Sequence, residues 1–373
     1  MFKRLCAVTA AALLTVASYA AAVEMRDGHP TTYTVQRGDT LWDIAGRFLS
    51  KPWLWPEIWQ ANPQIENPHR IYPGDVISLA YLDGRAVVQT TQAGPRTEPA
   101  ITTVPLADVE AFLRQSSVVA EFEDLPHVVS LEEGHLRGVD GQIAYVRGLE
   151  GASVGDTIML VRPTHHFRLP AARRVTNLIP TELDHRGDET YRDVRSAWGR
   201  DLARGESLGY ELTRQSLARI TQIQGDVALA LLVDGTADVR PGDRAVPAEA
   251  QPYDDSFLPQ APTSIPEHAA VIGIADAGLA GGPKSVVALA VGSADGVKNG
   301  TVFSTWRAGQ AVPDDVKNAN RIAAARDSVQ LPDEFSGRVM VFRTFDRVSY
   351  ALIMEGIRPV MVGDKLKSPD ATQ

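Results

Sequence analysis

One spacing pattern occurs four times in the chain and restricts most of it to β structure. In each copy an apolar residue stands two positions before Gly or Ser, a small aliphatic residue follows, and a second Gly precedes Asp or Thr. The copies span residues 146–156, 233–243, 291–301 and 354–364. The pattern predicts an apolar strand that ends in a turn, an aliphatic side chain that hooks back onto the core, and a Gly-Asp turn that begins the next strand.

The same copies indicate how the chain is divided. At 373 residues it exceeds what one hydrophobic core usually organises. Two copies precede the Pro-rich stretch 251–266 and two follow it, so we expect a mostly β middle domain over 106–250, a linker over 251–266, and a mostly β C-terminal domain over 267–368. Ala107–Gln115 fits a short helix, and His165–Arg204 is expected to be a polar, partly helical insertion.

The segment before residue 83 has a different pattern, in which the apolar period changes within a few residues. Tyr33 and Val35 alternate with polar neighbours, as in a half-buried strand. The apolar residues that follow are spaced as on one face of a helix: Leu41, Ile44, Ala45 and Phe48. Between them Gly38 suits a turn with positive φ, and Thr40 suits the helix N-cap with Asp43 as its capping-box partner.

A second helix and a second strand are predicted further along. An apolar stripe from Leu54 to Ala61 predicts the helix, which ends where Pro63 forces the preceding residue out of helical geometry. The apolar run Val76–Leu79 predicts the strand. The order over residues 31–82 is therefore strand, helix, helix, strand, a small α+β module, and the polar stretch 83–105 is expected to be a linker.

Short motifs in this segment resemble the LysM family of peptidoglycan- and chitin-binding modules. They are Tyr33-Thr34-Val35, Gly38-Asp39-Thr40-Leu41, Ile44-Ala45, Asn62-Pro63 and Ile71-Tyr72-Pro73-Gly74-Asp75. The resemblance implies two helices on one face of a two-stranded sheet and a shallow groove for N-acetyl sugars. Carried over to this chain, the groove would be lined by Gly38, Asp39, Thr40, Leu41, Asn62, Gln64, Ile65, Asn67 and Pro68. Taken singly, Gly38, Asp39 and Thr40 also fit a plain turn and cap, and that alternative stays open.

This segment is also rich in tryptophan. Four of the chain's six Trp lie within it: Trp42, Trp53, Trp55 and Trp59. Indole rings can stack on sugars, or they can fill the core of a small domain that has few other large apolar residues. Of these two interpretations we favour core filling.

The N-terminus has the pattern of a secretion signal over residues 1–22. Lys3 and Arg4 precede an apolar run from Leu5 to Ala17, and small residues follow, so we expect cleavage near Ala22 and a periplasmic mature chain without a transmembrane segment. The chain's Cys6 lies in this leader, which leaves no thiol for catalysis. Loss of Lys3 and Arg4 would take the formal net charge from −9 to −11, a poor surface for nucleic acid or anionic lipid.

A peptidoglycan hydrolase is one alternative, because LysM modules are often fused to such enzymes. Gly205–Gly209 fits the nucleophile-elbow string, but charged residues precede it and alternating residues follow it, where an elbow needs a strand and then a helix. The eight His lack zinc-site spacing, and only His165 and His166 are close in sequence. Acidic residues at 121–124 and 132–133 suit strand edges as well as a glycosidase pair. We therefore expect no catalytic site, metal or cofactor.

The C-terminal third shows a second resemblance. Val291–Gly300 and Leu331–Ala351 resemble the C-terminal β domain shared by a flagellar T-ring protein and the LysM-containing, type IV pilus secretin-associated proteins. This resemblance implies a protein that binds peptidoglycan and anchors an outer-membrane secretin to the cell wall. A flagellar basal-body accessory protein remains a further alternative.

Overall fold

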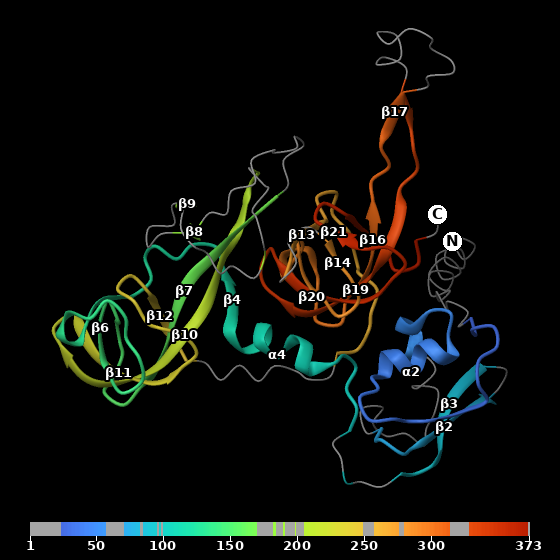
Figure 1. Cartoon of the computed structure of the whole chain (residues 1–373), viewed down its shortest axis with the longest axis horizontal. Coiled ribbons are helices and arrows are strands. Elements are labelled where there is room, and N and C mark those ends of the chain that lie inside the picture. Colours follow the sequence, from blue (N-terminus) through green and yellow to red (C-terminus); the bar gives the residue numbers. More distant parts are fainter. Residues whose placement is uncertain are drawn as a thin grey trace, which may run out of the picture. The chain divides into compact units, whose positions relative to one another are not determined.

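The computed structural model forms two compact units, residues 1–101 and residues 102–373. It describes residues 24–56, 71–82, 85–94, 97, 100–169, 182–183, 189–190, 198, 205–248, 257–275, 280–313 and 328–371. The expected leader at residues 1–22 lies outside these ranges. Figure 1 labels the helices and strands.

The N-terminal unit contains a three-stranded antiparallel sheet. Its strands are β1 (Thr32–Thr34), β2 (Val76–Leu82) and β3 (Arg85–Gln92), in the order β1-β2-β3. Helix α2 (Leu41–Phe48) and the 3₁₀ turn η1 (Pro52–Leu54) lie between β1 and β2 in the chain. The predicted first strand, first helix and last strand are confirmed. Residues 55–56 are helical, and the rest of the predicted second helix lies outside the described residues.

Helix α2 supplies much of the core of this unit. The four residues predicted to share its apolar face are all buried: Leu41, Ile44, Ala45 and Phe48. Full burial of a Leu, Ile or Phe side chain stabilises a fold by roughly 1.5–3 kcal/mol. An isolated eight-residue helix is unstable in water, so burial of this apolar face is what stabilises α2. The apolar spacing therefore predicted both the helix and the side that it buries.

Strand β3 corrects the predicted linker at residues 83–105. Residues 85–92 pair with β2, with Val88 opposite Leu79 and Arg85 opposite Leu82. The sequence contained a signal for this hairpin, because the dipeptide Asp83-Gly84 between two apolar runs is typical of a two-residue hairpin loop. These two residues lie outside the described part of the chain.

The first part of residues 102–373 is a closed β-barrel. Helix α4 (Leu106–Gln115) precedes it, as predicted. The strands are β4 (Ser116–Val119), β5 (His127–Leu131), β6 (Ile143–Arg147), β7 (Thr157–Arg168), β10 (Ser207–Gln224), β11 (Val227–Gly235) and β12 (Arg244–Pro247), and η2 (Glu132–Gly134) is a 3₁₀ turn. The sheet order is β11-β6-β5-β12-β7-β10-β4, and β11 also pairs with β10, which closes a ring with β4 outside it. Strand β10 allows this closure, because residues 210–213 pair with β4 and residues 216–224 pair with β11.

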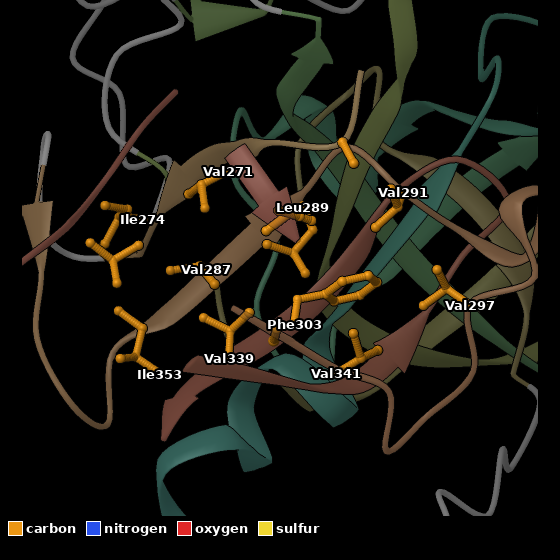
Figure 2. Packing of buried hydrophobic residues seen from close by; sticks show 14 residues of the cluster. Val271, Ile274, Val287, Leu289, Val291, Val297, Phe303, Val339, Val341 and Ile353 are labelled. Atoms are coloured by element: carbon orange, nitrogen blue, oxygen red, sulfur yellow. The ribbon is translucent and has the colours of Figure 1, made fainter. Parts of the chain in front are cut away.

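The second part is another closed barrel. Its main strands are β13 (Val271–Ile274), β15 (Val286–Leu289), β16 (Val302–Arg307), β19 (Glu334–Thr344), β20 (Ser349–Gly356) and β22 (Lys365–Lys367), with the shorter elements β14 (Ala280–Gly281), η3 (Ser293–Asp295) and β21 (Val360–Met361). The sheet order is β13-β15-β20-β19-β16-β22, and a bridge from Ala270 to Lys365 joins its two ends. Figure 2 shows the core inside this ring, where Phe303, Val339 and Ile353 are buried.

Both barrels have the same topology. When the ring strands are numbered along the chain within each barrel, the order is first, second, fifth, fourth, third, sixth in both. Such an order needs strand pairs between residues far apart in sequence, and it is improbable that two unrelated folds share it. The chain therefore contains two copies of one barrel, and the repeat in its sequence reflects this duplication.

The four copies of the repeat occupy equivalent places, two in each barrel. The second glycine of each copy has a positive φ: Gly155, Gly242, Gly300 and Gly363. The side chain after it accepts a hydrogen bond from the backbone N–H three residues earlier, as Asp156 does from Ser153 (2.8 Å) and Asp364 does from Met361 (3.0 Å). The aliphatic hooks pack into the cores, and they are Ala152, Val239, Val297 and Val360. The predicted turns and hooks are confirmed.

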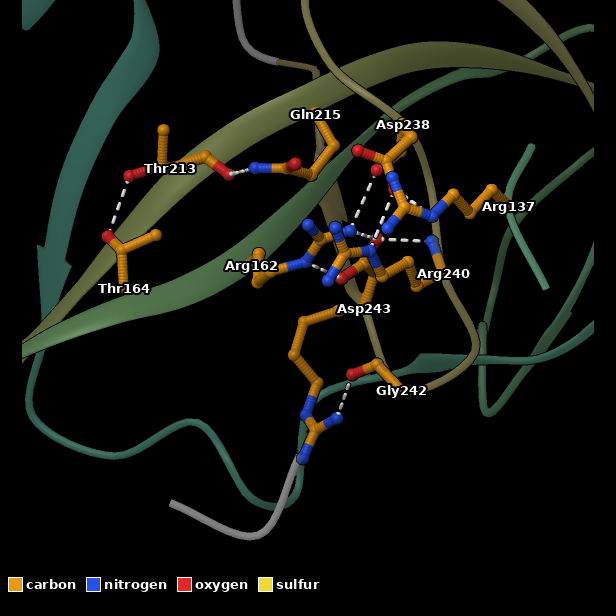
Figure 3. Close-up of polar contacts among 10 residues, drawn as sticks. Arg137, Arg162, Thr164, Thr213, Gln215, Asp238, Arg240, Gly242 and Asp243 are labelled. Atoms are coloured by element: carbon orange, nitrogen blue, oxygen red, sulfur yellow. Dashed lines mark hydrogen bonds and ion pairs between the residues drawn. The ribbon is translucent and has the colours of Figure 1, made fainter. Parts of the chain in front are cut away.

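Each barrel also holds an arginine-aspartate pair at the same place. Arg162 contacts Asp243 through Nε and Oδ1 (2.7 Å) and through Nη2 and Oδ2 (2.8 Å), and Nη2 also donates to the carbonyl of Asp238 (2.7 Å) (Figure 3). In the second barrel Arg307 Nε lies 3.6 Å from Asp364 Oδ1, and Nη2 donates to the equivalent carbonyl at 2.8 Å. Because the pair recurs, we assign it to the barrel framework.

The predicted insertion at His165–Arg204 is partly wrong. Residues 165–168 belong to strand β7, where His165 pairs with Glu211 of β10. In the rest of that range, the described residues contain two short paired strands, β8 (Glu182–Leu183) and β9 (Glu189–Thr190), and no helix. The same connection of the second barrel carries the hairpin of β17 (Ala311–Pro313) and β18 (Ser328–Gln330).

The two barrels meet in a buried contact within residues 102–373. Tyr350 OH donates to Glu211 Oε1 (2.9 Å), and Trp198 Nε1 donates to the same oxygen (2.7 Å). The rings of Phe112 and Phe167 lie 5.4 and 5.5 Å from the Trp198 ring. The predicted boundary at 251–266 falls between the barrels, which nevertheless form one compact unit.

Candidate glycan-binding site

The turn after β1 depends on the carboxylate of Asp39. Asp39 N donates to Gln36 O (3.2 Å), and Asp39 Oδ2 accepts hydrogen bonds from Gln36 N and from Tyr33 OH (both 2.8 Å). Burial, followed by the nearby Asp39 carboxylate, raises the pKa of Tyr33, so its hydroxyl remains a donor. Gly38 has a φ of 90°, which favours glycine. The turn has the same hydrogen bonds as the Gly-Asp turns of the barrels.

Thr40 and Leu41, the next two residues of the predicted site, form the start of helix α2. Thr40 is its N-cap: Asp43 N donates to Thr40 Oγ1 (3.1 Å), and Thr40 N donates to Asp43 Oδ2 (3.3 Å), which completes the expected capping box. Thr40 Oγ1 also donates to Asp43 Oδ2 (2.7 Å). Thr40 is buried, and Leu41 is 0% exposed. Leu41 therefore presents no surface to a ligand and serves the core.

Gly38, Asp39, Thr40 and Leu41 form the first wall of the predicted groove, and these contacts limit which of their groups can bind a sugar. The side chains of Asp39, Thr40 and Leu41 are engaged within the fold, whereas Arg37 and Gly38 are exposed. Sugar hydroxyl and acetamido groups pair well with backbone N–H and C=O groups that are held in place. The exposed peptide groups at residues 37–38 are thus the chemically suited part of this wall.

The second predicted wall lies outside the described residues. It comprises Asn62, Gln64, Ile65, Asn67 and Pro68. Beyond it, residues 72–75 form another Gly-Asp turn, in which Tyr72 N donates to Asp75 Oδ2 (2.9 Å). Val35 N donates to Asp75 O (2.9 Å), and Gly74 N donates to Val35 O (2.8 Å). The structure thereby joins the first turn of the predicted site to the end of the second loop.

Sequence reasoning missed a contact from the end of β3 to this turn. Gly94 N donates to Asp75 Oδ1 (2.7 Å), and Asp75 is buried. A Cβ at Gly94 would lie 2.3 Å from the carbonyl carbon of Gly74, so only glycine fits here without movement. The Gly-Asp pattern could have indicated the turn, but no local signal marks Gly94 as its partner.

The tryptophans of this unit mostly fill its core. Trp42, Trp53 and Trp55 are all buried. Trp59 lies outside the described residues. Core filling is therefore confirmed for these three indoles, which cannot stack on a sugar while they remain buried.

Ser207 of the Gly205–Gly209 string has a histidine neighbour, but their geometry opposes nucleophilic catalysis. Ser207 Oγ lies 2.8 Å from His166 Nε2, and Arg168 donates to His166 Nδ1 (2.9 Å). Burial, followed by the charge of Arg168, lowers the pKa of His166 to about 4, so the ring is neutral. Because Nδ1 accepts from arginine, the proton lies on Nε2, which donates to Ser207 and cannot take its proton.

The glycines of the same string have structural roles. Gly209 has a φ of 124° at an irregular pairing in β10, and a Cβ there would lie 2.6 Å from the carbonyl oxygen of Val119. A Cβ at Gly205 would lie 2.1 Å from the carbonyl oxygen of Leu169. Ser207 begins a strand and not a helix. The string is therefore no nucleophile elbow, in agreement with its sequence context.

The acidic residues considered for a glycosidase pair lie at opposite ends of β5. Glu123 accepts from Phe122 N (3.1 Å) before this strand, and Glu132 accepts from Ile143 N (3.2 Å) after it. Five residues at about 3.3 Å each span roughly 16 Å. The carboxyl groups of a glycosidase pair are about 5–10 Å apart. The acidic residues before β5 and those after it are therefore too far apart to form such a pair.

Comparison with known proteins identifies the N-terminal module. Residues 33–80 match the LysM domain family. The matched region runs from β1 to β2 and includes the turn, the capping box and the buried face of α2. The chain therefore contains a LysM domain, a module whose presence implies binding of peptidoglycan or a related carbohydrate.

A distant relative shares this similarity. The chain is 40% identical over 60 residues to a Bacillus subtilis (strain 168) protein described as "Uncharacterized protein YqbP". The match covers 13% of this chain and 27% of that protein. The chain thus spans well under two thirds of its relative's length.

Among the residues that the structure describes, no helix is both long and apolar enough to cross a membrane. In the same ranges, no three His, Cys, Asp or Glu side chains gather where they could hold a metal ion.

Proposed function

We propose that this chain is an exported, non-enzymatic protein that binds peptidoglycan through residues 24–101 and anchors an outer-membrane secretin of the type IV pilus through residues 102–373. The LysM domain at residues 33–80 is the observation that carries the proposal. It accounts for attachment to the wall, because its exposed turn offers fixed backbone donors and acceptors to neutral sugars.

The second half of the proposal rests on what the larger unit contains. Residues 102–373 hold two barrels that lie outside the region matched by the LysM domain family. The two segments that resemble the secretin-associated proteins belong to the second barrel: 291–300 includes η3, and 331–351 includes β19. A barrel pair tied to a small wall-binding module suits a tether between the wall and a protein complex.

Binding to purified sacculi tests the first half. The full mature chain and a chain that lacks residues 24–101 are incubated with sacculi, which are then pelleted. We expect the full chain to pellet and the shortened chain to remain in solution. Muropeptides in the supernatant are measured in the same tubes. Their release above a buffer control would contradict a non-enzymatic role.

Co-purification from membranes tests the second half. A C-terminal tag is placed on the full chain and on the chain that lacks residues 24–101. We expect the secretin to accompany both, because the partner is assigned to residues 102–373. Recovery of the secretin with the full chain alone would contradict this division of roles, and recovery of flagellar basal-body proteins in its place would favour the flagellar alternative.

A further inference from the structure

The two barrels close one end in the same way. In the first barrel Gly138 and Val239 exchange backbone hydrogen bonds of 2.8 and 3.0 Å. In the second barrel Gly281 of β14 pairs with Val360 of β21. A Cβ added at Gly138 would lie 3.0 Å from the side chain of Leu131, and a Cβ added at Gly281 would lie 2.9 Å from the side chain of Ile274. The glycine and the valine therefore face the core in both barrels.

The residues beside this pair face away from the core, because side chains alternate across a strand. In the first barrel they are Arg137, Val139, Asp238 and Arg240. In the second barrel the equivalent positions hold Ala280, Gly282, Pro359 and Met361. The barrel framework thus closes without the two arginines, which are a special feature of the first barrel.

These residues and Leu136 form what we call the closing patch. Arg240 Nε lies 2.7 Å from Asp238 Oδ2, and Arg137 Nε lies 3.7 Å from the same oxygen (Figure 3). The side chain of Arg137 is 68% exposed and that of Arg240 is 39% exposed. Leu136 and Val139 are 82% and 59% exposed. The patch therefore presents two oriented guanidinium groups beside two accessible aliphatic side chains.

The loop at residues 135–142, which carries Leu136, Arg137 and Val139 of the patch, is held by internal hydrogen bonds. Val139 N donates to Gln142 Oε1 (3.0 Å), and Gln142 Nε2 lies 3.3 Å from His135 Nδ1. A loop fixed in this way loses little conformational entropy on binding, which favours affinity.

We propose that the closing patch docks a protein partner through a segment that carries carboxylates beside apolar side chains. Arginine is enriched at protein interfaces, exposed apolar side chains that gather in one place mark interaction sites, and planar guanidinium groups pair well with carboxylates. Glu133 and Asp140 lie on the same loop, and the chain is acidic as a whole. This mixture of charges disfavours nucleic acid and anionic membranes, which need a continuous basic surface. The proposal is independent of the role assigned to the LysM domain.

Selection from a random peptide library tests the proposal with the full mature chain as bait. Peptides are selected on the wild type, and their affinities are then compared with those for the double variant R137E/R240E and for L136S. The control is R358E, whose arginine lies in the second barrel, is 44% exposed and pairs with Glu334. Unfolding curves verify that the exposed substitutions leave the fold intact.

Selected peptides should contain Asp or Glu beside apolar residues. Each lost guanidinium contact should weaken their binding about tenfold or more, whereas R358E should leave it unchanged. Bound peptide should also slow hydrogen exchange at residues 135–140. Peptides that bind all variants equally, or that lack acidic residues, would overturn the proposal. Self-association of the wild type that R137E/R240E abolishes would assign the patch to a second copy and would likewise overturn it.

Discussion

The hydroxyl of Tyr350 donates a 2.9 Å hydrogen bond to Oε1 of Glu211, a residue of the other barrel. Both side chains are buried. Glu211 also accepts from Trp198 Nε1 (2.7 Å) and Thr164 Oγ1 (2.8 Å). A buried carboxylate is tolerated only when donors replace the water it has lost, and here one donor belongs to the second barrel. The contact between the barrels is thus organised around an acidic side chain.

Removal of the Tyr350 hydroxyl should weaken this contact. We expect Tyr350→Phe to lower the free energy of unfolding by roughly 1–3 kcal/mol, because Glu211 stays buried with one donor fewer. Urea unfolding followed by circular dichroism measures the change. Tyr145→Phe is the matched control, since Tyr145 is a half-buried residue of β6. Equal effects of the two substitutions would show that the hydrogen bond does not stabilise the contact.

The stability of the larger unit should depend on pH through Glu211. Burial raises the pKa of Glu211 above 4.5, although the hydrogen bonds from Trp198, Thr164, Tyr350 and Ser116 oppose that effect. A carboxyl group with a raised pKa in the folded state contributes most below its unfolded pKa, and this contribution is lost as pH rises through the folded pKa.

Glu211→Gln isolates this effect, because glutamine keeps an acceptor for Tyr350 and cannot ionise. From pH 4.5 toward neutrality, we expect the free energy of unfolding of the wild type to fall relative to that of Glu211→Gln. Urea unfolding curves at several pH values give the difference. A difference that stays constant over this range would mean that Glu211 titrates alike in both states.

The repeated arginine-aspartate pairs allow a comparison between the barrels. Asp243 is 3% exposed and is held in bidentate fashion, so Arg162→Ala should cost on the order of 3 kcal/mol by leaving a buried carboxylate without its partner. Asp364 is equally buried, but Arg307 lies 3.6 Å away and Ser336 Oγ donates to the same carboxylate (2.9 Å), so Arg307→Ala should cost less, about 1 kcal/mol. Denaturant unfolding of both variants checks the ranking. A larger loss for Arg307→Ala would contradict it.

The contact from Gly94 should stabilise the LysM domain. Gly94→Val places a side chain against the backbone of Gly74 and breaks the hydrogen bond to Asp75. We expect hydrogen exchange in residues 72–92 of the full chain to quicken by about tenfold or more. The control is Gly46→Ala in α2, where the added Cβ would meet Pro52 at an ordinary 3.5 Å and alanine favours the helix. Unchanged protection in Gly94→Val would exclude this role for Gly94.

Substitutions at Thr40 distinguish a role in capping helix α2 from a role in contacting sugar. Thr40→Ala should destabilise α2 by about 0.5–2 kcal/mol, whereas Thr40→Ser should keep the cap. Because the hydroxyl is engaged with Asp43, both variants should still bind sacculi well below their unfolding temperatures. Hydrogen exchange of α2 and sacculus pelleting are measured together. If Thr40→Ala lost binding with α2 still protected, the hydroxyl would belong to the glycan site.

Much of the structure of the LysM domain could be predicted from residues that are close together in the sequence. The period of Leu41, Ile44 and Phe48 predicted α2 and its buried side, and the Thr40–Asp43 spacing predicted the cap. These features are local, because a helix brings together residues three or four positions apart. The predicted role of Gly38 and its neighbours in glycan binding stays a prediction, since a turn and a cap account for the same residues.

The errors arose where pairing partners are distant or compete. Strand β3 was interpreted as a linker because its polar residues concealed a hairpin whose other strand lies just before it. Residues 165–168 were assigned to an insertion, although β10 extends far enough to pair with them. Strand propensity is sensitive to such context, because each strand is stabilised by its neighbour.

For the barrels, the sequence by itself determined the turns. The recurrent glycine specifies them through its steric freedom, and the recurrent aspartate through a hydrogen bond from the backbone N–H three positions earlier. Both effects act within a few positions of the chain. Only the tertiary structure decided that four such units close into two rings with the same strand order, and that Glu211 meets Tyr350. Alternation along a strand determines which side chains face inward, but it does not determine which distant strand supplies the next hydrogen bonds.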